Sequence, residues 1–440
     1  MTRSLSLFIA SLLLGGVGTA CERSGAVVTP TVAPPEATPI AEPLESKPIA
    51  SVADGGGVAV LGFGGTIAGK ADGPFNPNYS AGGVCLAQPE AGGDPGIVDI
   101  LLEQQVLKSC EPSRVCDVPN TGCRGASCQA ELGGNELPVS FCDIERLDSA
   151  KVTPANWLII AERVEKTLAQ PDVRGVVITH GTDTLEETAY LLDLVLATDK
   201  PVVVAAAMRA SNHLSADGYM NLMNAIALAA SPEAEGRGVL VVLDDTIFAA
   251  RNVTKAHTTN PAAFESSTGS IGEIYFGEPR FHAEPRAQAA SDFNIDTLRS
   301  VIVQGVLSKE AETEIIYEYA GGTGRALSGA IGSAPESPIM GVVVASSGNG
   351  GVSSATERSL ALAAERGLYV AFSSRTGAGY VTSLPKVDGL NSLSAKDLSP
   401  QQARVLLILG LAATRSCKPG QPCFDQPSRR AMLQAYFDRH

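Results

Sequence analysis

The turn in which Thr182 and Asp183 follow a His-Gly pair holds the hydroxyl and carboxylate best placed for chemistry in this sequence. It follows residues 176–178, a β-branched run that suits a buried parallel strand. Thr184 and Glu187 have the spacing of a capping box, so we expect a helix to begin at about Thr184. Open α/β sheets bind ligands at such turns, because the unpaired N–H groups and the dipole of the helix favour an anionic group. Thr182 and Asp183 together therefore indicate a site, whereas Thr184 alone is an ordinary helix cap.

A second turn of this kind lies near the start of the folded part. A strand expected at 58–63 leads into the sequence GGTIAG at 64–69, whose glycines allow close approach of another group to the backbone. The pattern is neither the GxGxxG nucleotide fingerprint nor a Walker loop, so it implies no phosphate cofactor. Tyr79 lies in the polar stretch 71–83, which has the composition of a surface loop, and a single loop tyrosine is usually only a packing residue.

Alternating strands and helices must position these turns. Strands are expected at 58–63, 175–179, 202–207 and 238–243, and helices at 156–168, from about 184, and at 218–229. This alternation predicts a parallel sheet with helices on both faces, and Lys255 lies in a polar stretch that follows. A smaller series comes next, with strands expected at 314–319, 339–345 and 368–372 and helices near 326, at 356–366 and from 399.

Composition narrows the classes of function. A chain of 440 residues, of which 44% are apolar and 18% charged, is long enough for two domains with substantial cores. A formal net charge of −14 and a pI near 4.9 argue against a nucleic-acid partner and against an anionic membrane surface. We therefore expect a small-molecule partner and no nucleic acid.

The amino-terminal residues predict export. Residues 1–21 combine Arg3, an apolar run too short to span a bilayer, and small residues before Cys21, as in a secretory signal. The end of this segment also resembles a bacterial lipoprotein processing site, in which Cys21 would carry a lipid anchor, the one expected membrane attachment. Residues 22–57 are rich in Pro and Ala and predict an extended tether.

The cysteines predict disulfide bonds. Setting Cys21 aside leaves eight cysteines, an even number in a chain expected to be exported. The spacings between 110 and 128 lack the CxxC pairs of structural zinc sites, so disulfides are favoured over metal. Cys417 and Cys423 are expected to close a local loop, and the pairing of the other six stays open. Those six cysteines are Cys85, Cys110, Cys116, Cys123, Cys128 and Cys142.

Taken together, these motifs resemble those of the bacterial-type L-asparaginases. The turns at 64–69 and 180–184 look like the two signature motifs of that family. The similarity spans nearly all of the chain from Val58 to about Ala413, and the order and spacing of its motifs are highly specific. It continues through residues 186–190, 207–209, 215–218, 238–242, 253–255 and 373–375.

The resemblance implies an α/β fold with a large N-terminal doubly wound, mostly parallel sheet domain and a smaller C-terminal α/β domain. The expected N-terminal domain covers 58–276 with a cysteine-rich insertion at about 85–142, and the C-terminal domain covers 309–440 after a connection at 277–308. The resemblance also implies a homotetramer with sites between subunits. The reaction would be hydrolysis of L-asparagine to L-aspartate and ammonia through a covalent acyl-enzyme, without metal or cofactor.

The family's catalytic roles can be carried over position by position. Thr66 would be the nucleophile, and Tyr79 would help to remove its proton. Thr182, Asp183 and Lys255 would form the hydroxyl, carboxylate and ammonium group that supports attack or activates water. A threonine hydroxyl needs such neighbours, because it is a poor nucleophile until a nearby group accepts its proton.

The same transfer names substrate-binding positions. Ser149 would hold the α-carboxylate of the substrate, Asp183 its α-ammonium, and Ala207 would offer backbone to the amide. Ala150 stands where many secreted members carry a glutamine that contacts substrate, so one polar contact is absent. Phe63 replaces the usual small hydroxyl residue before the first glycine turn. His180 lies in the second motif, but a structural hydrogen bond is its expected role.

Simpler interpretations and other functions remain open at this point. Taken alone, Lys255 would be a solvated surface lysine and Ser149 a helix cap. Within the enzyme class, the runner-up is a dual glutaminase-asparaginase, while an amidotransferase subunit acting on aminoacyl-tRNA is disfavoured by the acidic charge and the export signal. From another class, the chain could be an amino-acid-binding envelope lipoprotein without turnover.

Overall fold

The computed structural model describes a subset of the chain. Its described residues all belong to one structural unit, Glu42–His440. The expectations for the signal at 1–21, for Cys21 and for nearly all of the tether at 22–57 lie outside them. The described residues are 56–71, 79–80, 86–87, 97–103, 105–113, 123–132, 135–284, 292–303, 306–307, 312–332, 339–415, 417, 421 and 425–440.

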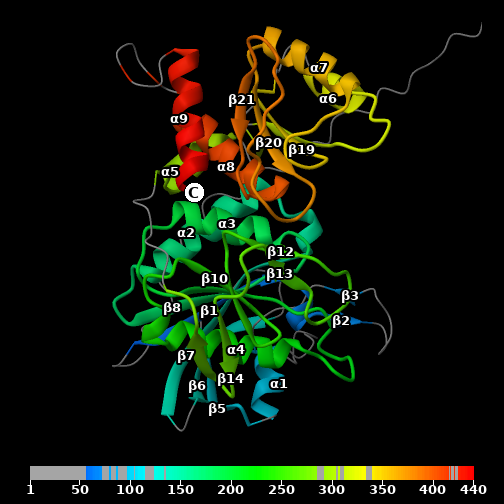
Figure 1. Cartoon of the computed structure of the whole chain (residues 1–440). Helices are drawn as coiled ribbons and strands as arrows, with labels where there is room; N and C mark the ends of the chain where they lie inside the picture. Colours follow the sequence, from blue (N-terminus) through cyan, green and yellow to red (C-terminus); the bar gives the residue numbers. More distant parts are fainter. Residues whose placement is uncertain are drawn as a thin grey trace, which may run out of the picture. The chain divides into compact units, whose positions relative to one another are not determined.

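A large mixed sheet forms the N-terminal domain (Figure 1). Five adjacent strands of this sheet are parallel, and they run in the order β10-β9-β8-β1-β7. Strands β8, β9 and β10 are rich in β-branched residues, and these strands and β1 are almost entirely buried, as parallel strands between two helix layers must be. The five strands are β1 (Gly57–Gly64), β7 (Asn135–Leu147), β8 (Val173–Thr179), β9 (Val202–Ala205) and β10 (Val239–Leu243).

Antiparallel strands complete the sheet at both edges. Beyond β10 lie β11 (Thr246–Ala249), β14 (Gly272–Tyr275) and β15 (Glu278–Phe281). Beyond β7 lies β6 (Cys123–Leu132), which pairs with both β5 (Leu107–Ser113) and β4 (Leu86–Ala87). The sheet is therefore mixed, with a parallel centre and antiparallel edges.

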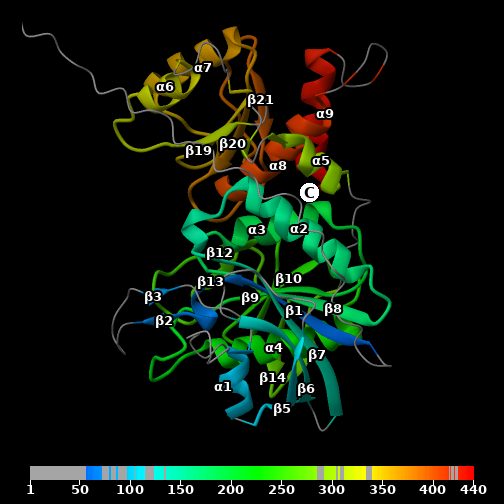
Figure 2. The same ribbon diagram turned by 180° about the vertical axis from the view of Figure 1, so that it is seen from behind.

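Helices cover both faces of this sheet, with α2 and α3 on one side and α4 and α1 on the other (Figures 1 and 2). Alternate residues of each strand point to opposite faces, so Leu61 packs with α2 and α3 while Val60 packs with α1 and α4. The doubly wound arrangement expected from the sequence is confirmed. The helices are α1 (Ile97–Glu103), α2 (Pro154–Leu168), α3 (Leu185–Val195) and α4 (Gly218–Ala230).

The C-terminal domain has its own four-stranded parallel sheet, in the order β18-β19-β20-β21. Side chains of α6 and α7 share one buried cluster with it, and α8 packs against β19. The expected smaller C-terminal α/β domain is confirmed. Its elements are β18 (Thr313–Tyr317), α6 (Arg325–Gly332), β19 (Gly341–Ser346), α7 (Ser354–Glu365), β20 (Tyr369–Ser374), β21 (Asn391–Ser394), α8 (Pro400–Ala413) and α9 (Gln426–Arg439).

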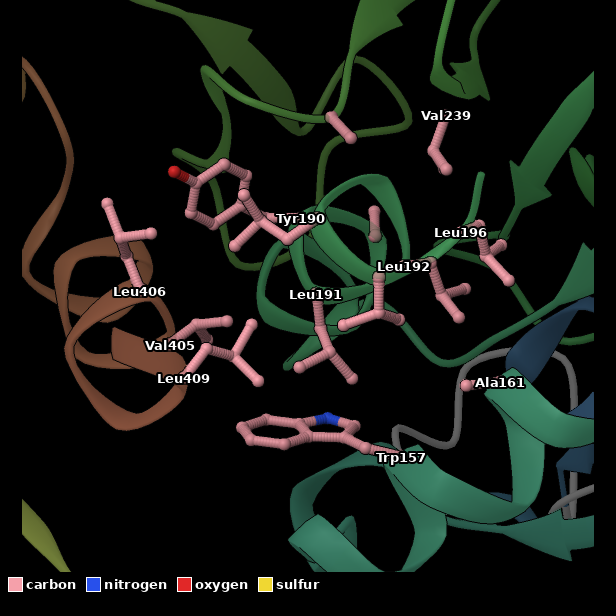
Figure 3. Packing of buried hydrophobic residues seen from close by; sticks show 14 of the residues in the cluster. Trp157, Ala161, Tyr190, Leu191, Leu192, Leu196, Val239, Val405, Leu406 and Leu409 are labelled. Carbon is pink, nitrogen blue, oxygen red and sulfur yellow. The ribbon is translucent and has the colours of Figure 1, made fainter. Parts of the chain in front are cut away.

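Helix α8 joins the two domains through one continuous hydrophobic cluster. Val405 and Leu409 of α8 pack beside Leu191 of α3 and Trp157 of α2 (Figure 3). The indole N–H of Trp157 donates to the hydroxyl of Thr188 at 3.2 Å, so its polar group is satisfied inside the cluster. The helix expected from 399 is present, and Ser399 caps it with Pro400 at the first helical position.

The described residues of the cysteine-rich region include the strands β5, β6 and β7. Strands β5 and β6 form a hairpin, and β7 inserts directly beside β1. Cys110 and Cys128 face each other across this hairpin and form a disulfide with a Cα–Cα distance of 4.1 Å. Cys142 and Cys417 each take part in a disulfide bond as well. The prediction of disulfides is confirmed at these positions, and the Cys110–Cys128 pairing is one that the sequence left open.

The segment expected to connect the domains also contains regular structure, which its weak periodicity hid. It includes β15, the helix α5 (Ile295–Val301) and two short strands, β16 (Ile302–Val303) and β17 (Val306–Leu307). Helix α5 has a complete capping box, formed by Asn294 and Thr297. Within the part of the chain described here, no helix has the length and apolarity needed to cross a membrane.

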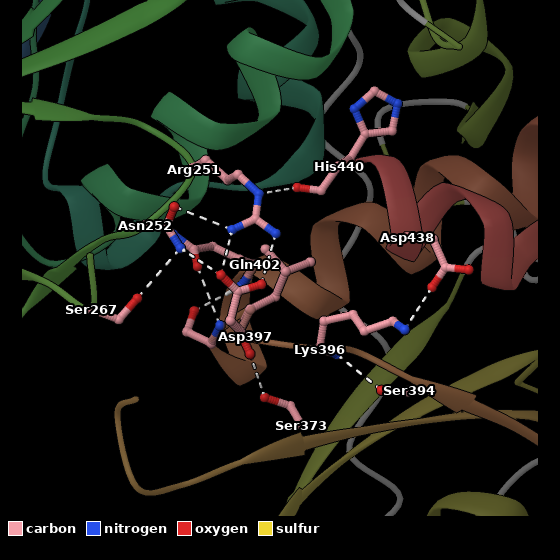
Figure 4. Close-up of polar contacts among 12 residues, drawn as sticks. Arg251, Asn252, Ser267, Ser373, Ser394, Lys396, Asp397, Gln402, Asp438 and His440 are labelled. Atoms are coloured by element: carbon pink, nitrogen blue, oxygen red, sulfur yellow. Dashed lines mark hydrogen bonds and ion pairs between the residues drawn. The ribbon is translucent and has the colours of Figure 1, made fainter. Parts of the chain in front are cut away.

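A buried ion pair ties the N-terminal sheet domain to the C-terminal domain (Figure 4). Both nitrogens of the Arg251 fork donate to Asp397 at 2.8 Å, and the two side chains are only 13% and 10% exposed. Burial alone would raise the pKa of Asp397, but the hydrogen bonds and charge of Arg251 and the hydrogen bond from Asn252 outweigh it and lower that pKa.

Asp397→Asn is therefore expected to lower the free energy of unfolding by about 3–5 kcal/mol, because it leaves the Arg251 charge buried without its partner. The control is Asp438→Asn, which removes a more exposed ion pair with Lys396 and should cost about 1 kcal/mol or less. Urea denaturation of both variants at pH 7 measures the difference. Equal, small losses would show that the Arg251–Asp397 pair does not stabilise the domain contact.

Candidate active site

Four of the sequence-predicted site turns lie on one edge of the large sheet. Strands β7, β1, β8 and β9 are neighbours and run parallel, so their carboxyl ends lie along the same edge. Each strand leads into a turn that carries a predicted site residue. Those residues are Ser149 after β7, Thr66 after β1, Thr182 after β8 and Ala207 after β9.

The turn that holds Thr66 lies against the turn that holds Thr182. Gly65 has φ +87° and ψ 177°, a conformation that only glycine adopts readily. A Cβ atom built on Gly65 would lie 2.6 Å from the backbone of His180 and Gly181, so the two turns are in direct contact there. Thr66 begins the short 3-10 helix η1 (Thr66–Ala68), and both Thr66 and Thr182 are almost fully buried.

Lys255 contacts the second turn from a separate hairpin. It ends β12 (Val253–Lys255), which pairs only with β13 (Phe264–Ser266) among the described strands. Its Nζ donates to Thr182 Oγ1 at 2.8 Å and to Asp183 Oδ1 at 2.6 Å. The Lys255 side chain is 19% exposed, and that of Asp183 is 49% exposed. The structure thus groups a hydroxyl, a carboxylate and an ammonium, and Lys255 is not a solvated surface lysine.

A cavity of about 320 Å³ opens beside this group. Glu186, in the first turn of α3, lines it and accepts the backbone N–H of Lys255 at 2.7 Å. In the sequence, Glu186 is only part of a motif, and nothing in its spacing indicates a contact with Lys255, which is 69 positions away. The other residues that line the cavity are Asp183, Thr254, Lys255, Ala256, His257, Thr258 and Gln401.

Ser149 links its own turn to the second turn. Its Oγ accepts the N–H of Asp183 at 3.1 Å, and its carbonyl accepts the Thr184 hydroxyl at 2.8 Å. Thr184 is the N-cap of α3, as expected, but the predicted capping box with Glu187 is wrong. The Thr184 hydroxyl is engaged by Ser149, and Glu187 instead forms an ion pair with Arg404 at 3.8 Å.

Backbone near Ala207 is held by a carboxylate that the sequence reading did not single out. Asp217 accepts the N–H groups of Met208 and Arg209 at 3.0 and 2.9 Å. Asn221, one turn into α4, donates to the carbonyl of Ala206 at 3.0 Å. These contacts fix the turn after β9, and Ala207 itself is fully buried.

Ala150 and Tyr79 are the two remaining predicted site positions. Ala150 is exposed, and its N–H donates to Asp148 at 3.1 Å. Tyr79 belongs to the short strand β3 (Tyr79–Ser80), which pairs with β2 (Lys70–Ala71) close after η1 in sequence. The backbone of Tyr79 is therefore connected to the Thr66 turn, and its side chain lies outside the described part.

His180 makes a structural hydrogen bond, which is the role expected from the sequence. Its ring is fully buried and stacks on Phe63 with 5.5 Å between ring centroids. Nδ1 lies 2.7 Å from the carbonyl oxygen of Gly181, which can only accept, so Nδ1 carries the proton. Nε2 has no hydrogen-bond partner among the described residues. Burial lowers the pKa of His180 to about 4, although the hydrogen bond to Gly181 acts in the opposite direction.

This low pKa predicts a loss of stability in acid. The unfolded chain binds a proton on His180 near pH 6.5 and the folded chain only near pH 4, so stability is complete above pH 6.5 and falls as the pH drops toward 4. Below pH 4, this difference in pKa lowers the free energy of unfolding by about 3 kcal/mol. His180→Asn removes the titrating imidazole and keeps an N–H that can donate to the carbonyl of Gly181. Urea unfolding at pH 7 and pH 4.5 should show a smaller acid loss for the variant; equal losses would contradict this.

Both domains match family models of known proteins. The family model "Asparaginase, N-terminal" matches residues 57–287, and the model "Glutaminase/Asparaginase C-terminal domain" matches residues 313–424. "L-asparaginase 2" from Bacillus subtilis is 38% identical over 293 residues, which are 66% of this chain and 74% of that protein. "Glutaminase-asparaginase" from Acinetobacter glutaminasificans is 37% identical over 281 residues, 63% of this chain and 82% of that protein.

A solved structure agrees with these sequence matches. The crystal structure of a probable cytoplasmic L-asparaginase from Campylobacter jejuni superposes with a TM-score of 0.65 at 31% identity, covering 88% of this chain and all of that one. The matched regions contain every sequence-predicted site residue named above. The fold, the family matches and the relatives agree, and the chain is an enzyme that belongs to the asparaginase family.

Proposed function

We propose that this enzyme hydrolyses the side-chain amide of L-asparagine to L-aspartate and ammonia. The observation that carries the proposal is the contact of Lys255 with Thr182 and Asp183, next to the turn that begins with Gly65 and Thr66. An amino-acid binder without turnover has no need of a lysine held against a buried hydroxyl. The names of the relatives point to the same class of substrate.

In the proposed mechanism, Thr66 Oγ attacks the carbon of the side-chain amide and gives its proton to a neighbouring acceptor, with help from Tyr79. Backbone N–H groups of the site turns stabilise the oxyanion, a contribution of about 3 kcal/mol per donor in related acyl-transfer sites. The carbon–nitrogen bond then breaks, ammonia leaves with the transferred proton, and an aspartyl ester remains on Thr66. Water, activated by Thr182, Asp183 and Lys255, hydrolyses this ester and regenerates the hydroxyl.

The contacts of Ser149 support its proposed role toward the α-carboxylate of the substrate. Its Oγ already accepts an N–H from Asp183, so its own proton stays available to donate to an anion. The carboxylate of Asp183 is half-exposed beside the cavity, where it can accept the α-ammonium. Ala207 offers backbone to the amide, and Ala150 offers no polar side chain, so Ser149 and Asp183 supply the main polar contacts.

A dual glutaminase-asparaginase is the second candidate within the same chemistry. The support for it is the 37% identity to a protein named glutaminase-asparaginase. The two candidate functions predict different ratios of kcat/KM for asparagine to kcat/KM for glutamine, measured on the same purified protein. A ratio near one favours the dual enzyme, and a large excess for asparagine favours the primary proposal.

An ammonia-release assay with wild type and Thr66→Ala tests the function. We expect release of one ammonia per aspartate by the wild type and a loss of about 10²–10⁴-fold in kcat for the variant. Equal rates would remove Thr66 from the mechanism. Saturable binding of asparagine by isothermal calorimetry, with no ammonia from the wild type, would instead support the non-catalytic binding protein.

The finer organisation is also a proposal. We propose export through residues 1–21, lipid anchoring at Cys21, a tether at 22–57, and a homotetramer with sites between subunits. The domain limits proposed from the sequence are 58–276, with the insertion at 85–142, and 309–440 after a connection at 277–308. Cell fractionation tests the location directly, which matters because the structural relative is named cytoplasmic. Light scattering of the purified protein tests the tetramer.

A further inference from the structure

We propose that Glu186 is a positioning residue that holds Lys255 in reach of Thr182 and thereby sets the rate of the chemical step. The inference rests on the proposed amide hydrolysis and adds a residue that acts on the site through Lys255. Glu186 follows the second site turn closely in sequence and lies in the first turn of α3. Its carboxylate is directed toward β12, the strand that ends at Lys255.

The contacts of Glu186 fix the backbone from which the Lys255 side chain extends. One carboxylate oxygen accepts the N–H of Lys255 at 2.7 Å, and the hydroxyl of Thr254 also hydrogen-bonds to the carboxylate. Strand β12 is only three residues long and its described ladder is with the equally short β13, so pairing alone holds it weakly. The hydrogen bonds of Glu186 therefore supply a tertiary anchor where the hairpin needs one.

The burial of Glu186 indicates that this anchor has a function. The residue is only 5% exposed, and burial raises the pKa of its carboxyl group, although the bonds from Thr254 and Lys255 and the charge of Lys255 oppose this. Acidic side chains are rarely buried to this extent unless they are paired. Here the partners all belong to the segment that presents the catalytic ammonium.

The neighbouring Glu187 shows what a structural glutamate in the same helical turn does. It is also largely buried, and burial raises its pKa. Its ion-pair partner is Arg404 of α8, at 3.8 Å, so its carboxylate is directed toward α8 rather than toward the β12 backbone that Glu186 holds. The two glutamates thus form a matched pair, with the same side chain and adjacent positions but different partners.

The length of the lysine side chain explains why its backbone must be fixed. Lys255 reaches Thr182 and Asp183 only at its tip, through a flexible four-carbon stem. Anchoring the backbone N–H and the tip leaves the stem few alternatives. A displacement of about 1 Å in a catalytic group can lower a rate by about 10²-fold, so loss of the anchor is expected to act on kcat.

Four variants assayed for ammonia release test the inference. Glu186→Ala removes the acceptor and should lower kcat by about 10²-fold with little change in KM. Glu186→Gln keeps an acceptor oxygen at the same reach and should recover most of kcat. Glu186→Asp keeps the charge but is one carbon too short and should recover little. Glu187→Gln should keep wild-type kcat. The ranking Gln above Asp identifies positioning, and the reverse ranking, or wild-type kcat for Glu186→Ala, would overturn it.

Crystal structures of the wild type and the Glu186 variants give a readout that does not depend on activity. The separation of Lys255 Nζ and Thr182 Oγ1, 2.8 Å here, should exceed hydrogen-bonding distance in Glu186→Asp and be retained in Glu186→Gln. An unchanged separation in Glu186→Asp would refute the role even if Glu186→Ala does not fold. A wild type without ammonia release would instead count against the proposed function, which distinguishes the two failures.

Discussion

Replacing Lys255 with methionine is expected to lower kcat for asparagine by about 10²–10⁴-fold, because the change removes the charged group that contacts Thr182 and Asp183. Methionine keeps an unbranched side chain of similar length, so packing beside the cavity changes little. The loss of folding stability should be about 1 kcal/mol or less, because the partner carboxylate of Asp183 is half-exposed and screened by water. Steady-state kinetics and thermal unfolding of the same preparation measure both effects.

The matched control for this substitution is Lys396→Met. Lys396 pairs with Asp438 at 2.9 Å and is also a partly exposed lysine in an ion pair, but its partner lies on α9 in the C-terminal domain. We expect Lys396→Met to show a similarly small change in unfolding temperature. Its kcat should equal that of the wild type. If Lys255→Met lost stability in proportion to its activity, the lysine would be an architectural residue and the proposed catalytic group would lose its cation.

Substituting Gly65 with alanine is the second change with a large expected effect. The added Cβ would lie 2.6 Å from the His180 and Gly181 backbone, in a conformation with φ +87° and ψ 177°. Backbone strain and overpacking together should destabilise the fold by about 2–5 kcal/mol. The two turns must also separate, so kcat in the remaining folded protein should fall by about 10²-fold. Urea denaturation and kinetics at a temperature where the variant is folded test both parts.

Gly236→Ala separates strain from close contact. Gly236 also has a positive φ, +68°, but a Cβ there would meet no atom within 4 Å. This control should cost about 1 kcal/mol and leave kcat unchanged. The larger loss of unfolding free energy in Gly65→Ala then measures two effects at Gly65, the contact between the two turns and the strain of its extended ψ. Equal costs and equal kcat would show that the Thr66 turn does not depend on its contact with the Thr182 turn.

The sequence predicted the central parallel strands and their helices because each has a simple pattern. Residues 176–178 are a β-branched run, and the helix from Thr184 has apolar residues at helical intervals. Both segments are almost entirely buried in the structure, so their local pattern and their tertiary environment agree. The same agreement made the expected ends of β1 and α4 accurate to within about one residue.

Other elements could not be predicted because their stability comes from distant partners. Strand β7 overlaps the cysteine-rich insertion, where the sequence pattern predicted no strand, yet it pairs with β1 and β6 over most of its length. Helix α9 has little amphipathic pattern, and it is held through the few buried residues that pack on α8 and β21, such as Leu433 and Tyr436. Periodicity within one segment cannot report contacts of this kind.

The candidate site shows the same division. The motifs identified Thr182, Asp183 and Lys255, which the structure brings together, although Lys255 is 73 and 72 positions away from the other two. The supporting carboxylates of Glu186 and Asp217 were not assigned roles, because their partners are backbone N–H groups, which any sequence provides. The capping box at Thr184 was predicted wrongly, because the competing acceptor, the carbonyl of Ser149, is 35 positions away.

In the proposed mechanism, Thr66 carries the acyl group during amide hydrolysis. The most direct measurement is rapid acid quenching of the enzyme during turnover of asparagine, followed by proteolysis and mass spectrometry. The account predicts an aspartyl group attached by an ester to the peptide that contains Thr66, and its absence from Thr66→Ala. An aspartyl adduct on the peptide that contains Thr182, or turnover with no adduct on either peptide, would contradict it.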